Sequence, residues 1–130
     1  MSGVKAGIML SNQQFEGADM VSALEKQIVM LRLARDRGWD SFFCGQHYLN
    51  EGGNQGLQIK DRFVIGSPED CWDQLKPYIE ELGVTHFVFR THFLGMPLSN
   101  ALASMRLMSE ELLPALHDAR PTPLEMITVA

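Results

Sequence analysis

The sequence has no apolar run approaching the ~20 residues needed to cross a bilayer, so a membrane protein is not expected. Basic residues are also scarce, because 11 Lys and Arg stand against 16 Asp and Glu, for a formal net charge of −5. A general nucleic-acid surface needs clustered Lys and Arg, and no such cluster is present. The first residues lack a sustained apolar region and a cleavage pattern, which favours an unprocessed, cytoplasmic chain.

Cofactor and disulfide motifs are missing as well. Cys44 and Cys71 are the only cysteines, and without Cys-x-x-Cys spacing we expect them to be reduced, buried thiols. The four histidines show no paired ligand spacing, so no metal site is expected. Neither a Gly-x-Gly-x-x-Gly sequence nor a P-loop occurs. The 130 residues, 45% of them hydrophobic, suit one domain with a single core.

Residues 1–49 predict a strand, a helix and a second strand. The apolar run 7–10 is typical of a buried strand, and the polar loop 11–14 follows it. Asp19 can cap a helix that Gly38 would end, and residues 41–45 read as a buried strand. The buried stripe that we assign to this helix consists of Val21, Leu24, Ile28, Leu31 and the stem of Arg35.

The remaining residues predict a glycine-rich loop at 50–61, a second strand and helix unit at 62–117, and an extended tail at 118–130. We expect strands at 63–66 and 85–90, and a tail segment 126–129 that could add to a sheet edge. The helix signals are Ser67 as a cap before Pro68, Pro77 as a kink or division, Gly83 as a stop, Ser99 as a second cap and Pro114 as a bend or end.

Strands that alternate with helices indicate an α/β fold with about four parallel strands, joined by right-handed βα units in one domain covering 1–130.

Several of these segments resemble the luciferase-like, flavin-dependent monooxygenases, a family that includes bacterial luciferase. Residues 7–10 with the helix 20–37 resemble the first strand and helix of the family. Residues 38–48 resemble its second strand, which usually ends in a Glu-His-His-like motif. Residues 62–71 are similar to the Val-Gly-Thr-Pro-Glu-Glu sequence before a late helix, and 83–90 and 105–116 resemble the closing strand and terminal helix.

The resemblance implies a (βα)8 barrel, of the triosephosphate isomerase (TIM) type, that has lost its middle part at residues 50–61. A full barrel takes ~250 residues, so this chain would supply a half-barrel in which the last strand lies beside the first. Such a half-barrel exposes an apolar inner face, which we draw from Ile8, Met9, Phe42, Phe43, Val64, Phe87 and Phe89. We expect a homodimer or higher symmetric oligomer to complete or cover it, and the alternative is a monomer whose tail and helices fold over it.

Barrel active sites form at the C-terminal ends of the strands, which places the candidate residues there. His47 matches the first histidine of the family motif and is the candidate general acid or base, with a structural histidine as the alternative. Asn12, Gln46 and Arg90 are the candidate cofactor-binding residues, and Arg90 could instead pair with a helix carboxylate.

The function that the resemblance implies is a flavin-linked oxidoreductase that uses FMN or a deazaflavin on a small-molecule substrate. The alternative is a non-catalytic half-barrel scaffold, an oligomerising remnant that binds no flavin. A nucleic-acid or membrane binder has no basic patch or amphipathic anchor in its favour.

Overall fold

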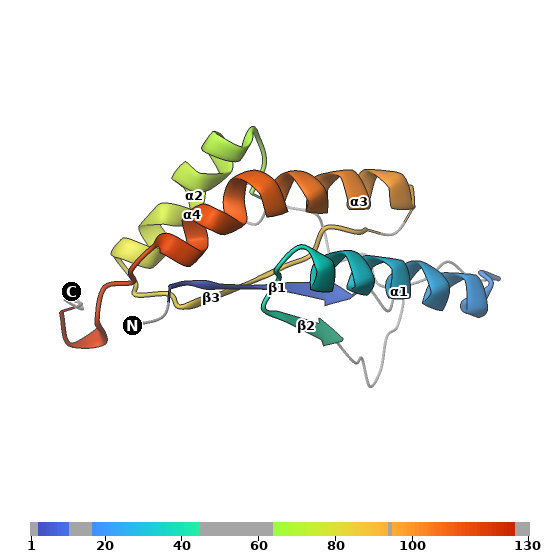
Figure 1. Ribbon diagram of the computed structural model, residues 1–130, viewed down its shortest axis with the longest axis horizontal. Helices are drawn as coiled ribbons and strands as arrows, with labels where there is room; N and C mark the ends of the chain where they lie inside the picture. The colour runs from blue at the N-terminus through green and yellow to red at the C-terminus, as the bar shows by residue number, and fades with distance from the viewer. Residues whose placement is uncertain (1–2, 11–16, 45–63, 94, 127–130) are drawn as a thin grey trace.

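The computed structural model describes residues 3–10, 17–44, 64–93 and 95–126, which form an α/β fold with a parallel sheet (Figure 1). The sheet has the strand order β2-β1-β3, where β1 is Lys5–Leu10, β2 is Ser41–Cys44 and β3 is His86–Phe89. In the central strand, Gly7 pairs with Ser41 on one side and with Val88 on the other. The first strand therefore lies between the second strand and the last one, as expected if the last strand of the chain lies beside the first.

The described segments hold three strands rather than the four expected. Val64 and Ile65, from the predicted strand 63–66, are exposed and lie outside any strand, while Phe63 falls outside the described residues. The tail segment 126–129 is described only at Met126, which belongs to the short 3-10 turn η2, Leu124–Met126. The tail instead contacts α2, because the Thr122 hydroxyl donates a 2.6 Å hydrogen bond to the Glu80 carbonyl.

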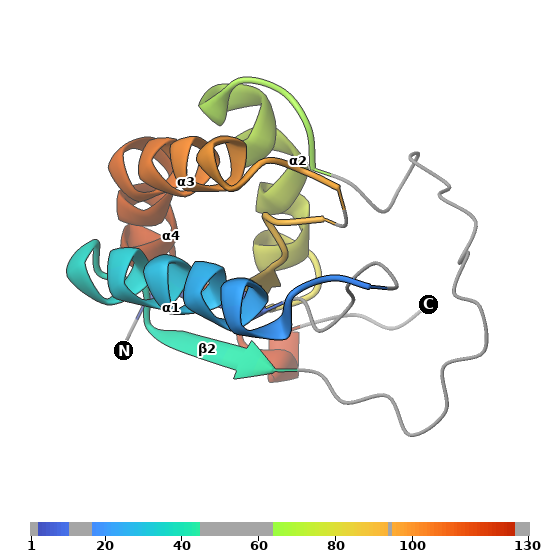
Figure 2. The ribbon, with the colours of Figure 1, turned by 90° about the vertical axis from the view of Figure 1, so that its right-hand side faces the viewer.

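The helices lie over one face of the sheet, as Figures 1 and 2 show from two directions. They are α1, Met20–Asp36; α2, Pro68–Glu80; α3, Leu98–Leu107; the π-helical turn η1, Met108–Leu112; and α4, Leu113–Asp118. Within the described residues, no helix combines the length and the apolar character that crossing a membrane requires.

Local signals set most helix ends. The Asp19 side chain accepts a hydrogen bond from the Val21 amide, and Ser67 forms a reciprocal capping box with Asp70 at the start of α2. Gly38 and Gly83 follow α1 and α2 with φ of 81° and 66°, so both predicted stops are confirmed.

The prolines and the second predicted cap behave differently from expectation. Pro77 does not divide α2, which runs unbroken from Pro68 to Glu80. The predicted cap Ser99 is wrong, because α3 starts at Leu98 with Pro97 in the capping position. Pro114 lies in the first turn of α4, directly after η1. Since proline has no N–H to continue the helical ladder, the wider π turn carries the chain past it without ending the helix.

The core forms between β1 and the helices. Alternate side chains of β1 and the residue before it point to the helices and are buried, namely Val4, Ala6, Ile8 and Leu10. The first three belong to one cluster with residues from α1, α2, α3, η1 and α4, including Met30, Ile79, Met105 and Leu116. Phe87 and Phe89 pair with Ala6 and Ile8 and pack on the same cluster. The helix side of the sheet thus holds the hydrophobic core.

This arrangement corrects the predicted inner face, because four of its residues lie on the helix side of the sheet: Ile8, Phe42, Phe87 and Phe89. The opposite face, on which no helix of the described residues lies, is called here the open face. By strand alternation it carries Gly7, Met9, Phe43 and Val88. A Cβ at Gly7 would lie 3.2 Å from the Phe43 ring, which shows that Phe43 leans over β1 on this face.

The buried stripe predicted for α1 is correct only at Leu31, which is partly buried and packs against the core. Val21, Leu24 and Ile28 are exposed, and the residues that face the core are Ala23, Met30 and Ala34. The stripe is present in the sequence at helical spacing, but it lies on the flank of α1 next to the core-facing side.

The cysteine prediction is half correct. Both cysteines are thiols that form no disulfide with each other, but Cys44 at the end of β2 is exposed rather than buried. Cys71 is partly buried at the start of α2, and burial raises the pKa of its thiol above the ordinary value.

A cluster of polar groups connects β1, β2 and α4 at the N-terminal end of the sheet. The Asp40 carboxylate accepts 2.8 and 2.9 Å hydrogen bonds from the Ala6 amide and His117 Nε2, and it lies 3.6 Å from Lys5 Nζ. Burial raises the pKa of Asp40, but these three partners outweigh it, so the pKa lies below its ordinary value. Asp40 therefore connects β1, the start of β2 and α4.

We predict that the contribution of Asp40 to the free energy of unfolding disappears in acid. Because the folded pKa is lowered, this contribution is complete above the pKa of an unfolded Asp, ~3.9, and disappears as the pH falls through the folded pKa. At neutral pH, Asp40→Asn should lower the free energy of unfolding by roughly 1–3 kcal/mol. Urea unfolding between pH 7 and pH 3 measures the free energy of unfolding of both proteins. The difference in this free energy between wild type and variant should become smaller in acid. A gap that stays constant with pH would contradict the assignment.

Candidate functional site

The C-terminal ends of the three parallel strands lie at one edge of the sheet. Leu10 at the end of β1 pairs with Cys44 at the end of β2, and Phe89 at the end of β3 pairs with Ile8. The segments after these strands are the ones that carry the predicted site residues. Of those residues, Asn12, Gln46 and His47 lie outside the described residues, whereas Arg90 is described.

Arg90 directly follows β3 and is exposed. Val88 lies on the open face, and a residue two positions later in an extended chain lies on the same side. Within the described ranges Arg90 forms no ion pair, so the expected alternative, pairing with a helix carboxylate, is not seen there. Its guanidinium is therefore a free donor group for an anion at this edge.

Thr91 carries a buried hydroxyl that has no hydrogen-bond partner among the described residues. A hydroxyl removed from water without compensation typically costs ~1–3 kcal/mol, so such groups are uncommon and concentrate where a ligand or water completes them. Sequence reasoning missed this residue, since a threonine at the end of a strand has no local signal that marks its hydroxyl as unpaired.

His92 is held by the loop after β3. Its Nε2 lies 2.9 Å from the Met96 carbonyl oxygen, in a turn where the Met96 amide donates to the Phe93 carbonyl. A carbonyl oxygen can only accept, so Nε2 carries the hydrogen and Nδ1 faces elsewhere. This contact makes His92 a residue that shapes the loop beside Arg90.

The candidate site is consequently the sheet edge at Arg90 and Thr91, from which the segments with Asn12 and His47 also depart. In the part of the chain that the structure describes, no group of three or more His, Cys, Asp or Glu side chains could hold a metal ion. The Asp40 cluster lies at the opposite, N-terminal end of the strands.

We predict that Thr91→Val stabilises the free protein. The change removes an unpaired buried hydroxyl and keeps the shape, so the free energy of unfolding should rise by roughly 1 kcal/mol. The matched control is Thr122→Val, which removes a hydroxyl that donates to Glu80 and should lower stability by a similar amount. Thermal or urea unfolding of both variants measures the difference, and equal losses would mean that Thr91 has a partner in solution.

Comparison with models of known protein families, with curated proteins and with solved structures finds no match to this chain.

Proposed function

We propose that this chain is a cytoplasmic, shortened relative of the luciferase-like flavin-dependent oxidoreductases, built as half of a TIM-type barrel. The observation that carries the proposal is the parallel order β2-β1-β3, in which the helices of the described residues all lie on one face. In a closed barrel the first strand lies between the second and the last, and helices cover only the outer face. An open doubly wound sheet has helices on both faces, so one-sided cover favours the barrel arc.

FMN or a deazaflavin is the proposed cofactor, bound at the C-terminal edge of the sheet. The fit rests on Arg90, a guanidinium without an ion-pair partner in the described residues, which suits a phosphate. Asn12 and Gln46 are proposed as further contacts, because their segments follow β1 and β2 at the same edge. The flavin, when bound, supplies the redox chemistry.

His47 is the proposed general acid or base. An imidazole titrates near neutral pH, and its segment follows β2 at the edge that Arg90 occupies. In this proposal it moves protons to or from a small-molecule substrate held at the open face. Met9, Phe43 and Val88 give that face its apolar character, which favours a flat, largely apolar substrate.

The proposed protein partner is a second copy of the chain. Phe43 and Val88 on the open face are 44% and 42% exposed, and β2 and β3 are the edges of the described sheet. Exposed apolar area costs ~25 cal/mol per Å², and unpaired strand edges favour association, so both features support a symmetric oligomer. A non-catalytic, oligomerising half-barrel without flavin remains the second candidate function, favoured by a sheet of three strands where a closed barrel has eight.

Flavin titration tests the proposal and separates the two candidates. FMN and a deazaflavin should each quench protein fluorescence on binding, and reduced pyridine nucleotide should then be consumed in the presence of the flavin. Arg90→Gln should weaken FMN binding about tenfold or more, because a charged hydrogen bond contributes ~1.5–3 kcal/mol.

Two controls make the flavin titration specific. Riboflavin lacks the phosphate, so wild type and Arg90→Gln should bind it equally. Arg106→Gln removes an exposed arginine of α3 and should leave FMN affinity unchanged. If neither flavin binds, or no nucleotide is consumed, the oxidoreductase proposal fails and the scaffold stands. Equal FMN affinity of wild type and Arg90→Gln would exclude Arg90 as the phosphate ligand.

A further inference from the structure

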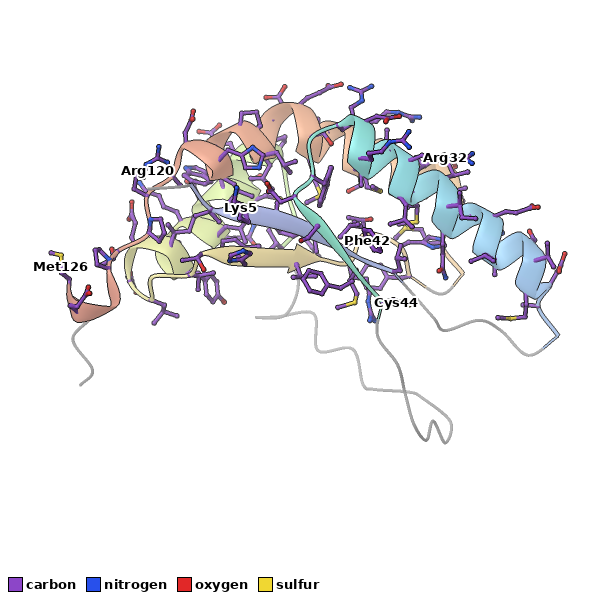
Figure 3. The ribbon with its side chains drawn as sticks, turned by 60° about the horizontal axis from the view of Figure 1, so that its bottom comes forward. Lys5, Arg32, Phe42, Cys44, Arg120 and Met126 are labelled. Carbon is purple, nitrogen blue, oxygen red and sulfur yellow. The ribbon has the colours of Figure 1, made fainter. Side chains whose placement is uncertain are left out.

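The centre of the open face is a flat apolar surface that spans three strands. Phe43 of β2 leans over Gly7 of the central strand, and Val88 of β3 pairs with Gly7 on its other side. Phe43 is 44% exposed and Val88 is 42% exposed. We call Phe43, Gly7 and Val88 the aromatic platform. Figure 3 brings the side of the sheet away from the helices toward the viewer, with Lys5 labelled on the central strand.

The platform depends on the absence of a side chain at Gly7. A Cβ at this position would lie 2.5 Å from Ser41 Oγ and 3.2 Å from the Phe43 ring, both closer than ordinary contacts. Three neighbouring strands span ~10 Å, because adjacent strands lie ~4.8 Å apart. This width suits two fused aromatic rings, which pack favourably on an aromatic side chain.

Basic groups lie at both ends of the aromatic platform. By strand alternation, Lys5 and His86 lie toward the N-terminal end of the sheet, and Arg90 lies toward the C-terminal edge. None of the sheet residues that alternation places on this face is acidic, although the chain has 16 acidic and 11 basic residues. Two copies that faced each other here would bring like charges together. The face therefore favours an anion over a second copy, and the proposed self-association would use the strand edges.

Lys5 and His86 have hydrogen-bond donors to offer. The two residues pair across β1 and β3. Asp40 Oδ1 lies 3.6 Å from Lys5 Nζ, too far for a hydrogen bond, and Asp40 accepts its hydrogen bonds from other groups. His86 Nδ1 lies 3.0 Å from Thr85 Oγ1, and when this hydroxyl donates to Nδ1, Nε2 carries the ring hydrogen. An ammonium and an imidazole N–H on adjacent strands thus suit the two oxygens of a carboxylate.

We propose that the open face binds an aromatic carboxylate, the substrate class of the proposed oxidoreductase. Its fused rings lie on the aromatic platform, and its carboxylate accepts hydrogen bonds from Lys5 Nζ and His86 Nε2. Arg90 at the C-terminal edge is then left for the flavin phosphate. The role as a substrate rests on the proposed function, whereas binding of the carboxylate to the open face does not require flavin.

Isothermal titration calorimetry of the full chain with 2-naphthoate, without flavin, tests the charged end of the site. 2-Naphthamide has the same rings without the charge, so it should bind about tenfold more weakly than 2-naphthoate. Lys5→Gln should weaken 2-naphthoate binding about tenfold and leave 2-naphthamide binding unchanged, whereas Lys5→Arg should retain the affinity for 2-naphthoate. The matched control is Lys26→Gln, which removes an exposed lysine of α1 and should change neither affinity.

Variants of Phe43 test the aromatic end. Phe43→Leu keeps an apolar side chain but removes the ring, so it should weaken binding of both ligands roughly fivefold, and Phe43→Tyr should retain it. The matched control is Phe42→Leu, because Phe42 is 63% exposed but lies on the helix side of the sheet, and this change should leave both affinities unchanged. Circular dichroism of each variant should match wild type.

The outcomes separate this site from the wider proposal. Absence of 2-naphthoate binding, as when a second copy covers the face, overturns the site and leaves the flavin titration to decide the proposed function. Equal affinity for the two ligands, or equal losses in Phe42→Leu and Phe43→Leu, also overturns it. Binding that requires the charge, Lys5 and the Phe43 ring supports the site. If flavin then fails to bind, the site stands and its role for a redox substrate falls.

Discussion

The pairing of β1 on both sides is the constraint on which the rest of the structure depends. This strand joins β2, which follows it closely in the chain, to β3, which lies about eighty residues later. Its alternate residues Ala6 and Ile8 are completely buried, and α1, α2, α3, η1 and α4 each contribute a residue to the cluster around them. Because a one-residue slip would turn these side chains into solvent, the hydrophobic pattern of β1 fixes the register of both neighbours.

The polar groups at the two ends of the sheet differ in how completely they are paired. At the N-terminal end, Asp40 joins β1 to α4 through paired, short hydrogen bonds. At the C-terminal end, Arg90 lacks an ion-pair partner within the described ranges and the Thr91 hydroxyl lacks a hydrogen bond. A folded protein tolerates such incomplete groups where a ligand uses them, which is why the proposed site lies at that end.

The sequence predicted most helix ends, which depend on residues that are close along the chain. It did not predict which side of α1 faces the core, because this helix has two adjoining apolar sides. The Asp19 and Ser67 caps and the Gly83 stop involve contacts between residues that are close in sequence, so the local sequence was sufficient to predict them. The helix α1 has apolar residues on two adjoining faces, and periodicity cannot tell which one meets the core. The small residues Ala23 and Ala34 face the core, where α1 lies against α3, and the larger Leu24 lies outside. For the site, sequence indicated Arg90 but not Thr91, whose unpaired hydroxyl follows only from tertiary packing.

The central claim is that the first and last strands are parallel neighbours, and nuclear Overhauser effects between their backbone protons test it most directly. The register predicts contacts from Lys5 to His86 and from Gly7 to Val88, together with slow amide exchange along β1. Contacts in this parallel register would support the account. Fast exchange at Ala6 to Leu10 with no contacts to residues 86–89, or contacts in an antiparallel register, would contradict it.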